Sequence, residues 1–367
     1  MKASFYNNVA KSTFSKNCLL KYTTEPFFPM SSPAYHHHQF WQVPEMVKIL
    51  NEFSYNVDAM NGEDKTTKLT KQYDLLIDHC PQNHSVYCNS LKQKCHKVFY
   101  STDACPSWHN SQHELRIKAV NARKHARLQM KASLLPLQHE PDQFDALFLA
   151  GNPFTFSTFA GYTFKQVSYI KNSACFFPDC DVSRKSPSSF LFFATYPQVL
   201  KGLDLLLEVF AKLPNAALVI CSQFQSEKDF CAIYNKELYQ CPNILPVGFV
   251  DIKSQLFRKV LQVCSYAILP SCSEGMSGSI LTAMSAGLIP IVSRECGISD
   301  NDAIILEDCT IDCLRRTIQL YAQKPLDWVQ RQARITQHIA RNNYSIDQFA
   351  TSFRSALHTL LNPNTAF

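Results

Sequence analysis

The chain has 367 residues, 46% of them hydrophobic, and a formal net charge of +6. This length exceeds one ordinary core, so we expect two domains, and the mild positive charge suits an anionic ligand rather than nucleic acid. No apolar run of about 18 residues and no secretion-signal core is present, so we expect a cytoplasmic protein with fifteen free cysteines. The cysteine and histidine spacing between residues 79 and 96 fits no usual zinc pattern, so we expect no metal site.

Apolar runs and helical stretches alternate through the first half of the chain. We expect strands over 18–22, 56–59, 73–77, 97–101 and 146–150, and helices over 39–53 and 113–131. This alternation predicts a Rossmann-like domain, from which residues 167–175 lead toward the second half.

The stretch Arg116 to Lys131 contains six Lys or Arg residues and no acid. At helical spacing, such a stretch could dock on an anionic membrane surface. Its apolar face is modest, however, so a solvated basic helix is the favoured alternative.

The second half contains six of the nine glycines, all between residues 202 and 297. We expect strands over 190–194, 217–221, 244–247, 266–269 and 289–293, and helices over 201–212, 227–239 and 255–263. Strands separated by helices predict a parallel sheet whose ligands collect at the carboxyl ends of its strands. A capping box at 345–348 then begins a final amphipathic helix.

The most specific segment runs from Pro270 to Gly297 and reads PSCSEGMSGSILTAMSAGLIPIVSRECG. An apolar strand ends at the proline, and a polar loop carrying Glu274 follows. Ser277-Gly278-Ser279 then begins an alanine-rich helix. A strand, a glycine loop and a helix N-terminus together suit a phosphate, because free N–H groups and the helix dipole converge there.

This segment resembles the donor-binding signature of GT-B nucleotide-sugar glycosyltransferases, the family-4-like group 1 enzymes. Residues 190–345 further resemble a subgroup of bacterial polysaccharide-biosynthesis transferases. The resemblance implies an α/β GT-B fold: two Rossmann-like domains face a cleft, and a C-terminal helix crosses back to the first domain. The implied domains are an acceptor-side domain (1–180), a donor-binding domain (181–344) and the returning helix (345–367).

The resemblance also assigns roles in the second half. Glu274 would contact the donor sugar, the amides of Ser277, Gly278 and Ser279 would hold the diphosphate, and Lys201-Gly202 would add a cation beside it. The alternatives are a helix cap for Glu274 and a surface lysine for Lys201. The turn Gly248-Phe249-Val250 would line the base pocket through backbone groups, or would need its glycine only for turn geometry.

Two positions depart from the general family pattern. Thr282 stands where a second glutamate usually binds the donor ribose, and its hydroxyl remains a candidate contact to the donor. The bacterial subgroup resembled here also has threonine at this position. The loop 194–200 carries neither the glycines nor the arginine that often precede the lysine.

Acceptor-side candidates lie at two strand ends of the first half. His79 falls on the second histidine of a D-x-x-H-x-H pattern, and Asp103 stands where relatives often place a catalytic histidine. The alternative for both residues is a structural role.

The sequence thus predicts transfer of a hexose from a nucleotide diphosphate sugar to a glycan or lipid-linked acceptor. The resemblance implies a retaining, metal-independent reaction with no cofactor beyond the donor. We expect a cytoplasmic enzyme with a further candidate contact to the inner membrane face. The rival hypothesis is an inactive GT-B-like binding or scaffold protein, because loop 194–200 and Thr282 depart from the pattern and the acceptor half matches it poorly.

Overall fold

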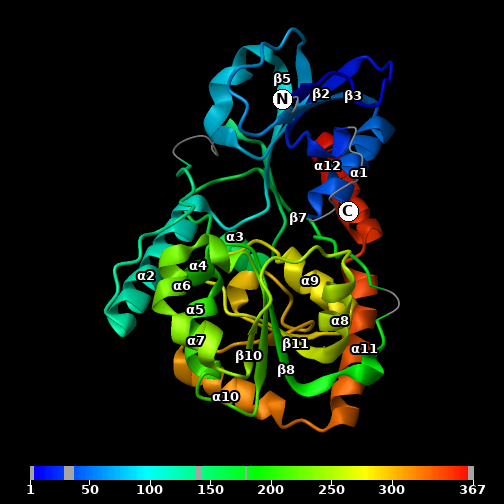
Figure 1. Ribbon diagram of the computed structural model, residues 1–367. Coiled ribbons are helices and arrows are strands. Elements are labelled where there is room, and N and C mark those ends of the chain that lie inside the picture. The colour runs from blue at the N-terminus through cyan, green and yellow to red at the C-terminus, as the bar shows by residue number, and fades with distance from the viewer. Residues whose placement is uncertain (1–3, 29–36, 138–142, 178–179, 363–367) are drawn as a thin grey trace. The chain divides into compact units, whose positions relative to one another are not determined.

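A computed structural model describes residues 4–28, 37–137, 143–177 and 180–362 of the protein (Figure 1). The chain divides into two compact units. Unit 1 comprises residues 1–105, 135–173 and 346–367, and unit 2 comprises 106–134 and 174–345. Residues 106–134, which lie inside the range predicted for the first domain, therefore belong with the second.

Unit 1 contains a seven-stranded sheet in the order β1-β3-β2-β4-β5-β6-β7. Its strands are β1 (Phe5–Tyr6), β2 (Lys16–Tyr22), β3 (Tyr55–Asn61), β4 (Tyr73–Asp78), β5 (Leu91–Ser101), β6 (Ala146–Leu149) and β7 (Gln166–Tyr169). All neighbours are parallel except β1 and β3. Strand β2 lies between β3 and β4, so the strand order reverses beside it, which is where open α/β sheets bind ligands.

Unit 1 has three α-helices among its described residues, and the first and last of them pack on the sheet. They are α1 (Gln39–Glu52), α3 (Pro153–Ser157) and α12 (Ile346–Leu361), with short 3-10 turns at Glu25–Phe27, Pro81–Val86 and Cys88–Ser90. Helix α12 packs against α1, and the Phe353 ring meets Phe148 of β6 edge-on at 5.9 Å. The final helix of the chain thus returns to the first unit, as predicted.

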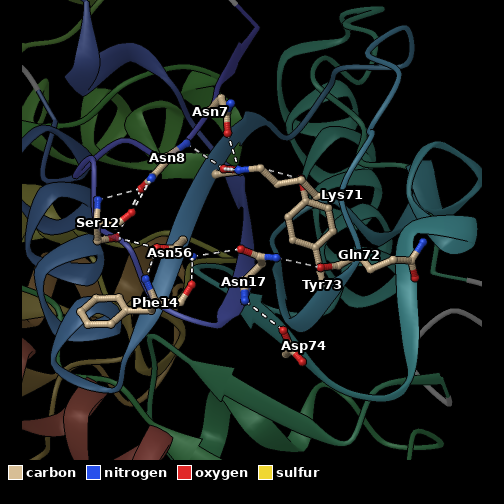
Figure 2. A network of polar contacts seen from close by, with 11 residues as sticks. Asn7, Asn8, Ser12, Phe14, Asn17, Asn56, Lys71, Gln72, Tyr73 and Asp74 are labelled. Atoms are coloured by element: carbon tan, nitrogen blue, oxygen red, sulfur yellow. Dashed lines mark hydrogen bonds and ion pairs between the residues drawn. The ribbon is translucent and has the colours of Figure 1, made fainter.

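A network of hydrogen bonds links the amino ends of β2, β3 and β4 to one another (Figure 2). The Asn56 side chain donates to Asn17 Oδ1 at 3.2 Å, and the Asn17 backbone N–H donates to Asp74 Oδ2 at 2.9 Å. Buried Asp58 accepts from Tyr73 Oη at 2.8 Å and pairs with Lys71 at 2.9 Å. These groups satisfy one another at the edge opposite the carboxyl ends, so we interpret the network as structural.

Unit 2 contains a six-stranded parallel sheet in the order β10-β9-β8-β11-β12-β13. Its strands are β8 (Ser186–Phe193), β9 (Ala217–Cys221), β10 (Ile244–Pro246), β11 (Cys264–Leu269), β12 (Ile289–Val292) and β13 (Ile304–Ile305). This is the strand order of the dinucleotide-binding Rossmann fold, with its switch point between β8 and β11. The loops that follow those two strands therefore frame the expected ligand site.

Helices cover both faces of the unit 2 sheet (Figure 1). They are α2 (Pro106–Lys124), α4 (Gln198–Lys201), α5 (Leu203–Phe210), α6 (Lys228–Ile233), α7 (Asn235–Gln240), α8 (Gln255–Val263), α9 (Gly278–Ser285), α10 (Ile311–Ala322) and α11 (Leu326–Asn343), with 3-10 turns at Val182–Arg184, Phe224–Ser226 and Arg294–Cys296. The prediction of two Rossmann-like halves is confirmed. The predicted helix 227–239 is in fact two helices, α6 and α7, which meet at Tyr234.

Helix α2 differs from the predicted helix over 113–131. It begins at Pro106, a residue that suits a first helical turn because its missing N–H would have no partner there. It ends at Lys124, because His125 adopts a left-handed backbone with φ of 50°. The basic residues beyond that point lie outside the helix.

Four of the six basic side chains of this stretch form ion pairs within unit 2. Arg123 binds Asp204 at 2.6 Å and Glu208 at 3.2 Å, and Lys124 binds Glu237 at 2.6 Å. Lys131 pairs with Asp229 at 2.5 Å, and Lys118 with Glu114 of the same helix at 2.7 Å. The charge of α2 therefore serves mainly to attach this helix to its own unit.

None of the helices in the described residues has the length and apolarity that crossing a bilayer requires. All fifteen cysteines are free thiols.

Candidate donor site

The junction between α4 and α5 lies directly against the carboxyl end of β11. Gly202 separates the two helices with a left-handed φ of 80°. A Cβ on Gly202 would lie 2.5 Å from the carbonyl oxygen of Pro270, so glycine alone permits this approach. The approach brings Lys201, the last residue of α4, next to the segment 270–277, which we call the β11–α9 loop.

Lys201 and Glu274 form an ion pair at the switch point. The distance from Lys201 Nζ to Glu274 Oε1 is 2.5 Å, and the two side chains are 14% and 11% exposed. These residues lie 73 positions apart in sequence, and both were predicted as site residues. The structure therefore places a cation and a carboxylate together where a parallel sheet binds its ligand, with part of each side chain open to solvent.

The β11–α9 loop is held by backbone contacts on two sides. The Cys272 N–H donates to the Leu200 carbonyl at 3.0 Å, and Ser293 Oγ donates to the Ser271 carbonyl at 2.6 Å. A Cβ on Gly297 would lie 1.8 Å from the Gly275 carbonyl oxygen, so the chain after β12 passes in close contact with the loop. The loop that carries Glu274 is therefore restrained at its start and at Gly275.

The N-terminus of α9 offers fewer free amides than the sequence predicts. The Ser277 N–H donates to the Cys296 carbonyl at 3.0 Å, so this amide already has an acceptor. Gly278 and Ser279 lie in the first turn of α9, where amides lack an acceptor within the helix. A bound diphosphate would therefore meet two of the three predicted amides.

Two further predicted contacts have structural roles in unit 2. Gly248 has a φ of 88°, and a Cβ there would lie 2.5 Å from Gln225 Nε2, so its turn requires glycine. Next to it, Phe249 is 57% exposed and Val250 is buried. Thr282 is buried, and its hydroxyl accepts a hydrogen bond from the Cys175 N–H at 3.2 Å.

Helix α2 contributes contacts to the β11–α9 loop that the sequence interpretation missed. His109 Nδ1 lies 3.1 Å from Ser273 Oγ, and Arg116 Nη1 donates to the Pro270 carbonyl at 3.1 Å. The i, i+4, i+7 spacing of His109, His113 and Arg116 places them on one helix face and is a signal that could have found them. It was missed because α2 was assigned to the other domain.

His113 lies between these two residues and is fully buried. Neither of its ring nitrogens has a hydrogen-bond partner among the described residues. Burial, together with the nearby charges of His109, Lys201 and Arg116, lowers the pKa of His113 to about 4. The ring is therefore neutral at pH 7. It lines a small, partly open pocket whose wall includes Pro197 and Glu227 but neither Lys201 nor Glu274.

The predicted acceptor-side residues lie at the switch point of unit 1. His79 directly follows β4, its Nδ1 lies 3.0 Å from the Tyr100 carbonyl, and its ring centroid lies 4.6 Å from that of Tyr22. Asp103 follows β5 and is exposed. Burial raises the pKa of Tyr22, and the charges of Tyr100 and Asp103 raise it further, so Asp103 lies near the same tyrosine.

His37 joins this group, and the sequence interpretation assigned it no role. Burial lowers the pKa of His37, whereas the neighbouring charge of Asp103 raises it. The charge of His79 lowers the pKa of His37 further. Three polar side chains from separate segments therefore lie near the carboxyl edge of the sheet.

A buried ion pair supports the strand end beside His79. Lys21 Nζ and Asp78 Oδ1 are 3.0 Å apart, and both side chains are fully buried. Tyr87 donates to the other Asp78 oxygen at 2.5 Å, and Lys21 also donates to the Cys80 carbonyl at 2.7 Å. Because every partner in this network is satisfied, we interpret it as a support for the segment that carries His79.

Across the described residues, no group of three or more His, Cys, Asp and Glu side chains is arranged to hold a metal ion.

Family comparison agrees with the geometry of unit 2. Residues 187–322 match the glycosyl transferases group 1 model. The matched range begins in β8 and ends with α10, so it contains both members of the Lys201–Glu274 pair. The predicted resemblance to this family is thus confirmed over the group 1 domain, whereas the bacterial subgroup remains a prediction. None of the curated protein sequences matches the chain.

Solved structures similar to the chain share its fold at low sequence identity. Sucrose-phosphate synthase from Thermosynechococcus elongatus is 11% identical with a TM-score of 0.64, over 95% of this chain and 100% of that one. Anabaena HepE, in complex with UDP-glucose, is 11% identical with a TM-score of 0.60, over 93% and 99%. At these identities, the likeness shows the GT-B fold alone.

S. aureus TarM is also similar in structure, with 12% identity and a TM-score of 0.55. The match covers 77% of this chain and 55% of TarM, so the chain spans about half of that protein's length.

Proposed function

We propose that the protein transfers a hexose from a nucleotide diphosphate sugar to a glycan or lipid-linked acceptor. The observation that carries the proposal is the Lys201–Glu274 pair at the switch point of a group 1 domain. A cation there suits a diphosphate leaving group, and a carboxylate suits sugar hydroxyls. The HepE structure contains UDP-glucose, so a UDP-sugar is the first donor to test.

Each donor-side group has one role in this proposal. Lys201 stabilises the negative charge that develops on the diphosphate as the glycosidic bond breaks. The Gly278 and Ser279 amides bind the phosphate oxygens, and Glu274 orients the sugar. The Gly248–Val250 turn lies beside the base. Because Lys201 supplies positive charge at the phosphates, the reaction is proposed to need no metal, and family resemblance favours retention at the anomeric carbon.

The acceptor is proposed to bind at the carboxyl edge of the unit 1 sheet. His79 and Asp103 lie there, at two neighbouring strand ends, and would hydrogen-bond an acceptor hydroxyl. We retain the cytoplasm as the proposed location. Contact with an anionic membrane has less support, because Arg123, Lys124 and Lys131 bind acids of unit 2.

The alternative of an inactive GT-B-like scaffold is favoured by two specific contacts. The Ser277 amide and the Thr282 hydroxyl, both predicted to bind the donor, are engaged by Cys296 and Cys175. A scaffold of this kind would keep the fold and would fail to bind nucleotide.

Calorimetric titration with UDP, GDP and ADP, without added metal, separates the two proposals. We expect micromolar binding of one nucleotide to the wild type and at least a tenfold weaker affinity for Lys201→Ala, because the ammonium group is lost. Lys118→Ala, on the exposed side of α2, is the matched control and should bind as the wild type does. If none of the three nucleotides binds, the donor site is refuted and the scaffold is favoured.

A further inference from the structure

Helix α2 lies outside the matched group 1 domain, yet it contacts the β11–α9 loop at two points. Arg116 donates to the Pro270 carbonyl at the first residue of the loop. His109 lies 3.1 Å from the hydroxyl of Ser273, the residue directly before Glu274. These two side chains therefore contact the loop at its first residue and at the residue before Glu274.

The other contacts of the loop lie at its start and at its end. The Leu200 carbonyl holds Cys272 from the α4 side, and Ser293 holds Ser271 from the end of β12. These contacts restrain the first half of the loop. The Ser277 N–H bond to the Cys296 carbonyl and the close approach of Gly297 to Gly275 restrain its second half. Among the described residues, it is His109 of α2 that forms a hydrogen bond with the Ser273 side chain from another element.

Helix α2 is itself rigidly attached. Arg123 and Lys124 bind acids on α5 and α7, and Ile117 and Val120 are buried in the core of unit 2. Because the backbone of α2 is held in place, a hydrogen bond from one of its side chains limits the motion of the loop.

We propose that Arg116 and His109 are positioning residues that hold the β11–α9 loop so that Glu274 stays beside Lys201. The inference rests on the proposed donor site, and it adds a segment of the first half of the chain to that site. Neither residue touches the reacting atoms. Both act through the loop, Arg116 on the Pro270 carbonyl and His109 on the Ser273 hydroxyl.

Amide hydrogen exchange of the full chain tests the inference without any ligand. In Arg116→Gln and His109→Ala we expect exchange in residues 270–277 to rise about tenfold, with β11 unchanged. His109→Asn should restore wild-type exchange, because its side-chain amide nitrogen can replace Nδ1 as the partner of Ser273. Lys124→Gln breaks a different bond between α2 and unit 2 and is the matched control.

Nucleotide titration of the same variants provides the second measurement. We expect UDP to bind about tenfold more weakly to Arg116→Gln and His109→Ala, because a loosened loop displaces the Gly278 and Ser279 amides that follow it. Binding to His109→Asn and Lys124→Gln should be normal. An equal effect of Lys124→Gln, no change of exchange in Arg116→Gln, or no rescue by His109→Asn would overturn the inference. If the wild type binds no nucleotide, the proposed function fails, while the exchange data still decide whether α2 positions the loop.

Discussion

The two Rossmann-like units present their candidate residues at equivalent places but assemble them differently. In unit 2, the loop, Glu274 and the N-terminus of α9 occupy one short stretch of sequence, and Lys201 joins them from the neighbouring strand end. In unit 1, His79, Asp103 and His37 come from three separate segments. The donor half can therefore be recognised from a local motif, whereas the acceptor half becomes visible only in the folded sheet.

The two units also differ in how they support these residues. Unit 1 places a buried ion pair, Lys21–Asp78, directly beside His79. Unit 2 instead relies on close backbone approaches at Gly202 and Gly297. Side-chain support tolerates sequence change nearby, whereas a close backbone approach demands glycine at a defined position. This difference explains why glycine spacing indicated the second site and not the first.

The largest effect is expected from breaking the support of unit 1. Asp78→Ala leaves the fully buried Lys21 ammonium without its carboxylate, and loss of one partner of a buried pair costs about 3–5 kcal/mol. Urea unfolding of the full chain should show a destabilised transition. Lys92→Ala, which breaks a pair with Asp74 in which the lysine is 43% exposed, should cost about 1 kcal/mol or less. Equal costs would contradict the buried support.

The next effect concerns the backbone support of unit 2. Gly297→Ala combines a φ of 66° with a Cβ 1.8 Å from the Gly275 carbonyl, so we expect a loss of about 3 kcal/mol in unfolding free energy. Gly161→Ala in unit 1 is the matched control, because its φ is 99° but nothing lies within 4 Å of the added Cβ. It should cost about 1 kcal/mol by thermal unfolding. An unchanged free energy of unfolding in Gly297→Ala would show that the loop can move away from the added Cβ.

Glu274→Gln tests the Lys201–Glu274 pair, because we expect it to affect nucleotide affinity and reaction rate in different ways. Loss of the carboxylate frees the Lys201 ammonium, so UDP should bind as well as or better than to the wild type. The sugar loses its charged acceptor, so hydrolysis or transfer from UDP-glucose should slow about a hundredfold. Calorimetry and a coupled UDP-release assay measure the two effects. Weaker UDP binding by Glu274→Gln would argue against the assigned roles.

His79→Asn tests whether unit 1 serves the acceptor. UDP binding should be unchanged, because His79 belongs to the other unit, while sugar transfer should fall about tenfold. His358→Asn, on the exposed side of α12, is the control for loss of a histidine. A reduced affinity for UDP in His79→Asn would assign this residue to the donor.

The smallest effect is the pH dependence contributed by His113. Its pKa is about 4 when folded, below the ordinary value of 6.5. Between these values the unfolded chain binds more protons, so stability falls as the pH drops from about 6.5 to 4. We expect His113→Leu to flatten this dependence, whereas His358→Leu should leave it unchanged. An unchanged pH profile would mean that His113 is not buried as a neutral ring.

The central strands of both sheets, several of their helices and the site motif of unit 2 followed from the sequence, whereas β1, β7, β13, α3, α10 and α11 were not predicted. Apolar runs bounded by turn residues predicted β9, α1 and α8 almost to the residue, because the hydrophobic pattern that specifies each element lies within its own segment. The Pro270–Gly297 stretch is likewise contiguous, so the geometry that suits a phosphate could be predicted before the fold was known.

Tertiary structure alone decided which amides and side chains remain open for a ligand. The Ser277 amide is engaged by Cys296, and the Thr282 hydroxyl by Cys175, through contacts between residues distant in sequence. Tertiary structure also decided that α2 belongs to unit 2, where Arg116 and His109 reach the β11–α9 loop. A helical pattern specifies which face is buried but not which sheet buries it, because that choice depends on partners far along the chain.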